Sequence, residues 1–73
     1  MSTNNQLIIM KTKSRVNPYE IWEHHCVDND FRFGENTRLA FATSLKKAII
    51  FANKYCQEEI VEYGYHIDDS CLI

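Results

Sequence analysis

Residues 44–64 read SLKKAIIFANKYCQEEIVEYG, and this stretch decides the fold because its apolar residues keep a helical period over several turns. Ser44 suits the N-cap of a helix, and Gly64 suits its end. Small residues on the apolar side allow the helix to lie close to a sheet or a second helix. The apolar stripe comprises Leu45, Ala48, Ile49, Ala52, Cys56, Ile60 and Tyr63, with Phe51 and Tyr55 on its flank.

The start of this helix has two interpretations. A helix that begins after Ser44 leaves residues 38–42 (RLAFA) free to form a short strand that leads into the cap. A helix that begins at Asn36 or Thr37 runs unbroken through the same residues, and propensity alone does not separate the two. We favour the later start, because the preceding sequence is typical of a strand before an N-cap.

The charges of the predicted helix oppose its dipole. With the later start, Lys46 and Lys47 fall in the first turn, whereas Glu58, Glu59 and Glu62 fall in the last. Each such charge costs about 0.3–1 kcal/mol before screening. Either the lysines join the free N–H groups of the first turn to bind an anion, or each charge has a tertiary partner or is solvated.

Two extended segments precede the helix. Residues 7–16 (LIIMKTKSRV) begin with apolar and β-branched side chains and then place a base at every second position. Residues 19–27 (YEIWEHHCV) are rich in aromatic and β-branched types. Asn17-Pro18 between them is a turn signal, so the two segments predict an antiparallel hairpin.

A loop over residues 16–19 fixes a register for this hairpin, and a loop one residue longer or shorter reverses the faces of one strand. The register predicts an ion pair and a cation–aromatic contact on the outer face. The opposed pairs are Arg15 with Glu20, Lys13 with Trp22 and Lys11 with His24. The predicted inner face holds Ile8, Met10, Ser14, Ile21 and Val27.

These elements predict an α+β fold, a single small domain over residues 1–73 in which one amphipathic helix packs on an N-terminal antiparallel hairpin. Residues 38–42 and 65–67 are candidates for a third and a fourth strand. Residues 1–6 predict a polar, flexible N-terminus, and residues 68–73 predict an acidic, polar C-terminal tail.

The chain has 73 residues, of which 45% are hydrophobic and 25% charged, so it forms one domain with a small core. Its net charge of −2 conceals an asymmetry: residues 1–54 hold all eight bases and five of the ten acids, and residues 55–73 hold the other five acids. A bipolar chain suits a specific partner or a homodimer better than general binding to a polyanion. A pI near 5.8 argues against duplex DNA.

The expected location is the cytoplasm. Three cysteines without a secretion signal predict reduced thiols. Cys71 is third from the end, so the last residues do not match a prenylation motif. No apolar run approaches the roughly 20 residues of a membrane-spanning helix, and we expect no membrane partner.

The histidines and cysteines are numerous for a short chain, but none are paired at the spacing of a zinc knuckle. A metal site would combine His24 and Cys26 with Cys56 or His66, and Cys56 already belongs to the apolar stripe. We therefore expect no metal and no cofactor. The sequence also lacks a phosphate-binding glycine loop and the common hydrolase motifs, so we expect no catalytic activity.

Two groups of bases define an alternative function. Lys11, Lys13 and Arg15 alternate along a predicted strand near aromatic residues, and Lys46 and Lys47 lie at the predicted helix start. Together they are typical of a surface that binds phosphate or single-stranded nucleic acid. The competing interpretation of the basic strand is an edge protected by charge against pairing with other chains.

Surface recognition is the function that remains. A core this small need not cover every large apolar residue. The candidates for an exposed binding surface are Trp22, Phe31, Phe33, Ile50 and Val61, the last two on the polar side of the predicted helix. We expect a small non-catalytic module that binds a larger protein or complex as an inhibitor or adaptor. Phage-encoded inhibitors of host machinery or bacterial defence, such as anti-CRISPR proteins, share this size and this lack of catalytic motifs.

Overall fold

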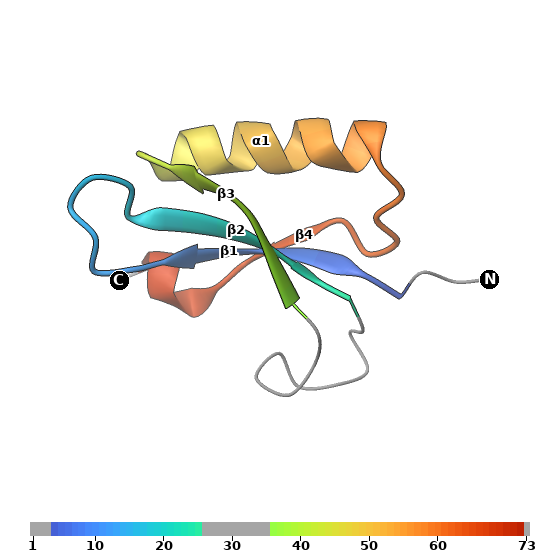
Figure 1. Ribbon diagram of the computed structural model, residues 1–73, viewed down its shortest axis with the longest axis horizontal. Helices are drawn as coiled ribbons and strands as arrows, with labels where there is room; N and C mark the ends of the chain where they lie inside the picture. Colours follow the sequence, from blue (N-terminus) through green and yellow to red (C-terminus); the bar gives the residue numbers. More distant parts are fainter. Residues whose placement is uncertain (1–3, 26–35, 73) are drawn as a thin grey trace.

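A four-stranded mixed sheet and one helix make up the fold in the computed structural model, which describes residues 4–25 and 36–72 (Figure 1). The predicted α+β class is confirmed. The strand order is β3-β2-β1-β4, with β1 and β2 in the middle. No helix in the described part is long and apolar enough to cross a membrane. The elements are β1 Gln6–Lys11, β2 Tyr19–His24, β3 Asn36–Ala42, α1 Leu45–Glu58, β4 Tyr65–Ile67 and the short 3₁₀ helix η1 Asp69–Leu72.

β1 and β2 form the predicted antiparallel hairpin in a different register. β1 ends at Lys11, and residues 12–18 form a longer connection in place of a tight turn. Lys11 therefore lies opposite Tyr19, and Ile9 lies opposite Ile21. Because Lys13 and Arg15 lie outside the strand, the predicted pairs are wrong: Lys11 with His24, Lys13 with Trp22 and Arg15 with Glu20.

The observed register decides which residues face the helix. Side chains alternate along a strand, so Ile8 and Met10 lie on the face opposite to that of the core. The prediction that these two residues lie on the helix-facing side is wrong, although Ile8 is itself buried at 8% exposure, and the prediction for Ile21 is confirmed. Ser14 lies in the connection, and Val27 lies outside the described residues. The buried core comprises Leu7, Ile9, Ile21, Ala42, Ala48 and Ala52.

α1 begins where the sequence predicts. The Ser44 hydroxyl accepts a hydrogen bond from the Lys47 N–H at 3.2 Å, which satisfies one free donor of the first turn. The alternative start at Asn36 or Thr37 is wrong, because β3 occupies these positions. The helix lies across one face of the sheet (Figure 1), where its buried alanines allow a close approach.

α1 ends at Glu58, before the predicted end at Tyr63. Glu59 takes an extended conformation, so the chain leaves the helix axis there. Ile60 is 78% exposed and Tyr63 is 52% exposed, and their predicted place in the core stripe is wrong. Gly64 does not end the helix, but its φ of +67° is a left-handed conformation that glycine adopts without strain on the way into β4.

The C-terminal segment folds back onto β1. β4 confirms the predicted final strand and pairs parallel to β1. After it, the Asp68 N–H donates to the Ile9 carbonyl at 2.9 Å, and the Lys11 N–H donates to the Ser70 hydroxyl at 3.1 Å. Residues 68–72 of the predicted acidic, polar tail therefore pack against β1, and Asp69–Leu72 form η1.

The N-terminal residues of the described chain are also part of the fold. Asn5 is only 5% exposed, and Gln6 is the first residue of β1. The Asn5 carbonyl accepts a hydrogen bond from the Tyr63 N–H at 3.0 Å. The predicted flexible N-terminus over residues 1–6 is wrong at these two positions, because they pack against the chain that follows α1.

Candidate functional site

The sheet face opposite α1 carries an acid, a base and two aromatic rings, which we call the outer platform: Glu20, Trp22, Arg38 and Phe41. In the pairing of β2 with β3, Glu20 lies opposite Phe41 and Trp22 lies opposite Arg38. The Arg38 guanidinium carbon is 4.4 Å from the centroid of the Phe41 ring and 5.9 Å from that of Trp22. Both distances are within the range of cation–π attraction.

Glu20 orients the platform from the β2 side. One carboxylate oxygen accepts a hydrogen bond from the Trp22 indole N–H at 3.0 Å, and the other is 3.6 Å from Arg38 Nη1. The Glu20 side chain is 18% exposed and that of Arg38 is 48% exposed. Exposed ion pairs add little to stability, so the main effect of this contact is to hold Arg38 in one orientation.

A β-bulge brings Arg38 and Phe41 to the same face. The two residues are three positions apart, and a regular strand would place them on opposite faces. The pairing of β2 with β3 shifts between Ile21 and Trp22, and the extra residue on β3 restores a common face. Sequence periodicity does not reveal this neighbourhood, because strict alternation groups Phe41 with Leu39, which packs against the core.

The three predicted partner-binding residues in the described part of the chain do not form one surface. Trp22 belongs to the outer platform, whereas Ile50 is 57% exposed on α1, at the opposite side of the sheet. Val61 lies after α1 and packs against the core, so its predicted place on the polar side of the helix is wrong. Phe31 and Phe33 lie outside the described residues.

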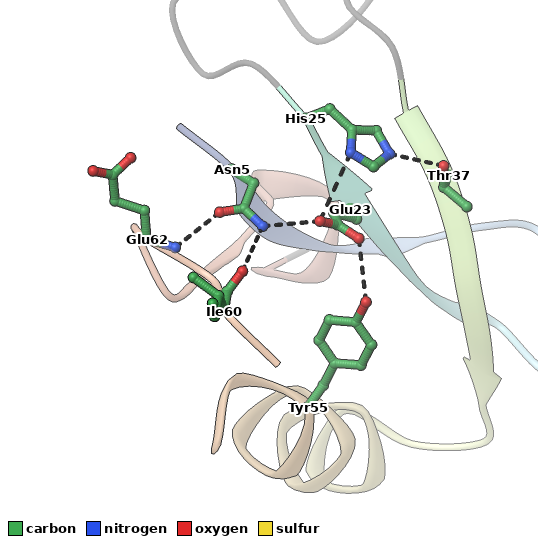
Figure 2. Close-up of polar contacts among 7 residues, drawn as sticks. All are labelled: Asn5, Glu23, His25, Thr37, Tyr55, Ile60 and Glu62. Atoms are coloured by element: carbon green, nitrogen blue, oxygen red, sulfur yellow. Dashed lines mark hydrogen bonds and ion pairs between the residues drawn. The ribbon is translucent and has the colours of Figure 1, made fainter. Parts of the chain in front are cut away.

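A second polar cluster lies between the sheet and the C-terminal half of α1 (Figure 2). The Glu23 carboxylate, 15% exposed, accepts hydrogen bonds from Asn5 Nδ2 at 2.9 Å and from the Tyr55 hydroxyl at 3.2 Å. Burial and the Glu23 carboxylate raise the pKa of Tyr55, so the phenol stays protonated as the donor. This cluster joins β2 to α1.

Asn5 extends the cluster to the turn after α1. Its Nδ2 also donates to the Ile60 carbonyl at 2.9 Å, and its Oδ1 accepts from the Glu62 N–H at 2.9 Å (Figure 2). One buried amide thus satisfies backbone groups on both sides of a sharp change in chain direction. These contacts hold the turn that follows the early end of α1, and they give the cluster a structural role.

His25 continues the cluster toward β3 (Figure 2). Its Nε2 is 2.8 Å from Thr37 Oγ1, and its Nδ1 is 3.7 Å from Glu23 Oε2. The Thr37 hydroxyl, the His25 imidazole and the Glu23 carboxylate are lined up as a nucleophile, a general base and an orienting acid would be in a catalytic triad. The second distance is too long for a hydrogen bond, however, so we assign His25 only the role of joining β2 to β3.

The metal-ligand candidates lie on separate elements. His24 is buried at the end of β2, Cys56 is on α1 and His66 is exposed on β4, whereas Cys26 lies outside the described residues. Burial raises the pKa of the Cys56 thiol. Within residues 4–25 and 36–72, no three His, Cys, Asp or Glu side chains are grouped as a metal site would require.

The predicted basic residues gather at one end of the molecule rather than along one strand face. Lys11 ends β1, Lys13 and Arg15 lie in the connection to β2, and Lys46 and Lys47 lie in the first turn of α1. Lys11 pairs with Tyr19, which in turn pairs with Ala42 just before the helix. Figure 1 shows the connection and the start of α1 at the same end.

The chain matches no protein-family model, no curated protein and no solved structure.

Proposed function

We propose that this protein is a small non-catalytic module that occupies a surface on a larger protein or complex, as an inhibitor or an adaptor, through the outer platform. The observation that carries the proposal is the position of Arg38, which is half exposed above Phe41 and held by Glu20. Tryptophan and arginine are enriched among the residues that dominate binding energy at protein interfaces.

The contacts of the platform support this role because they reduce the entropy cost of binding. Arg38 meets an acid and two rings before any partner arrives, so fewer rotamers are lost on association. Phe41 is 51% exposed, which leaves a large apolar surface for a partner to cover. The preferred partner surface combines an apolar pocket for Phe41 with a carboxylate for the Arg38 guanidinium.

The proposed location is the cytoplasm. Cys56 and Cys71 are both free thiols, which is the usual state of cysteine in a reducing compartment. We also propose that the protein is of the phage-encoded inhibitor type, because it is small and combines a binding surface with a lack of catalytic motifs.

Capture from a native lysate tests the proposal with two matched variants. Phe41→Asp places a charge on the outer platform, and Ile60→Asp places the same charge on an exposed apolar residue at the turn after α1. We expect Phe41→Asp to weaken binding of the captured partner at least about tenfold in a titration and Ile60→Asp to leave it unchanged. Equal binding by both variants, or loss with Ile60→Asp alone, contradicts the proposal.

A second candidate function rests on the five bases at one end of the molecule. Their convergence favours binding of phosphate or single-stranded nucleic acid at this end. An oligonucleotide titration at low salt tests it, since affinity for single strands falls with salt at a slope near −0.7 per phosphate contact. Lys13→Glu with Arg15→Glu removes the binding if this function is correct. No shift of the oligonucleotide at low salt excludes it.

A further inference from the structure

On the side of α1 that faces away from the sheet, basic residues come first along the helix and acidic residues come last. Ile50 is the one large apolar residue on this side among the described helical residues. Lys46 and Lys47 precede it, Lys54 follows it, and the acids lie at the end of the helix. The exposed positions are Lys46, Lys47, Ile50, Asn53, Lys54, Gln57 and Glu58, followed by Glu59.

This order of charge opposes the helix dipole at both ends. The first turn of α1 contains no acid and the last turn contains no base. Lys46 and Lys47 lie beside the partial positive charge of the helix start, and Glu58 lies beside the partial negative charge of its end. Within one molecule this arrangement is unfavourable, and a partner that places opposite charges on both ends would offset it.

We propose that a second copy of this chain docks on this side of α1, with the two helices antiparallel about a twofold axis. The bases at the start of one helix then meet Glu58 and Glu59 of the other, twice in the same interface. With Lys46 opposite Glu58, the centre lies at residue 52. Each Ile50 is then about 3 Å along the axis from that centre, so the two Ile50 side chains are neighbours.

A second copy fits this surface better than a partner that carries charge of only one sign. An acidic partner satisfies the lysines and repels Glu58 and Glu59, and a basic partner does the reverse. The twofold arrangement satisfies both halves and also aligns the two helix dipoles antiparallel. Lys54 lies opposite Ile50 of the other copy, where its aliphatic stem covers the apolar side chain while its ammonium group stays in water.

The expected dimer is weak and depends on salt. One pair of short helices buries less than the roughly 800 Å² per partner of a standard interface. Opposite charges at its two ends are screened as ionic strength rises. The outer platform lies on the other face of the sheet, so this inference does not rest on the proposed function, and a dimer would present two platforms.

Sedimentation equilibrium of the full chain tests the dimer first without any substitution. At a protein concentration of about 0.5 mM and a salt concentration of about 20 mM, we expect a mean mass well above the 8.6 kDa of one chain. At about 500 mM salt, we expect the mass to fall toward 8.6 kDa. A mass of one chain at low salt overturns the proposal.

Charge-reversed variants then locate the interface. We expect Lys46→Glu with Lys47→Glu to be monomeric alone, and Glu58→Lys with Glu59→Lys to be monomeric alone. An equal mixture of the two variants restores complementary ends and should regain the mass of a dimer. Both changes place favourable charges near the helix dipole, so neither variant is expected to lose its fold. A mixture that stays monomeric, or variants that dimerise like the wild type, overturns the proposal.

Discussion

The inner and outer faces of the same sheet differ in what their side chains do. On the inner face, Leu7, Ile9 and Ile21 are fully buried under α1 and make no polar contact through their side chains. On the outer face, Arg38 and Phe41 are about half exposed and Arg38 is oriented by a carboxylate and two rings. Burial of apolar area stabilises the fold, whereas exposed polar and aromatic contacts add little to it.

This difference separates the residues that maintain the fold from those available for recognition. Substitutions on the inner face should change the free energy of unfolding and affect binding only through it. Substitutions on the outer platform should change binding at nearly constant stability.

The largest effect is expected for Ile9→Ala. Ile9 is fully buried in the middle of the sheet, so the substitution leaves a cavity under α1 and lowers the free energy of unfolding by about 2–5 kcal/mol. Phe41→Ala on the outer face should cost less than about 1 kcal/mol. Urea unfolding of both variants measures the two values. Equal losses would remove the distinction between the faces.

The next effect is expected for Asn5→Ala at the border of the inner face. The buried amide bonds Glu23, Ile60 and Glu62, and its removal should cost about 1–3 kcal/mol. Gln6→Ala is the control, because its amide makes one long, exposed hydrogen bond of 3.5 Å. Thermal unfolding of both variants gives the comparison. A Gln6→Ala protein that is as destabilised as Asn5→Ala contradicts the assigned role of Asn5.

A pH-dependent effect is expected at the C-terminal segment. Hydrogen bonds from Ser70 lower the pKa of Asp68 below its ordinary 3.8. The ionised carboxylate therefore stabilises the folded state at pH values above 3.8, and this contribution is lost as pH falls through the lowered pKa. Unfolding measurements in acid should show a smaller loss for Asp68→Asn than for the wild type. The same acid dependence in both proteins would contradict this sign.

The smallest effect on stability is expected for Arg38→Ala. The ion pair with Glu20 is half exposed, so its loss should change the free energy of unfolding by less than about 1 kcal/mol. Binding of the partner should weaken at least about tenfold in the same variant, because arginine at such a surface carries much of the binding energy. If Arg38→Ala strongly destabilises the fold but binds the partner normally, the assignment of stability to the inner face and recognition to the outer face is wrong.

Local signals predicted much of the secondary structure. The Ser44 hydroxyl caps the helix itself, and the helical period that follows involves residues three or four positions apart. The predicted start of α1 is therefore correct. Residues 65–67 are also correct as a strand. The cap of α1 is decided within a few positions in the chain, and residues 65–67 show their strand character locally even though the strand they pair with, β1, is distant in the sequence.

Long-range contacts decided what the sequence did not predict. The hairpin register depends on the conformation of residues 12–18, which do not form a strand although their bases alternate as those of a strand would. The turn that follows the helix end at Glu58 is held by Asn5, a residue more than fifty positions earlier. The outer platform depends on a bulge in the pairing of two strands, and the sequence of β3 alone does not specify it.

Backbone amide spectra recorded while the captured partner is added test the central claim most directly. If the outer platform is the binding surface, the largest shifts occur at Glu20, Trp22, Arg38 and Phe41, and the signals of the buried residues under α1 stay in place. If the largest shifts instead lie on the exposed side of α1 or in residues 12–18, with the platform unchanged, the assignment of function to the outer face is wrong.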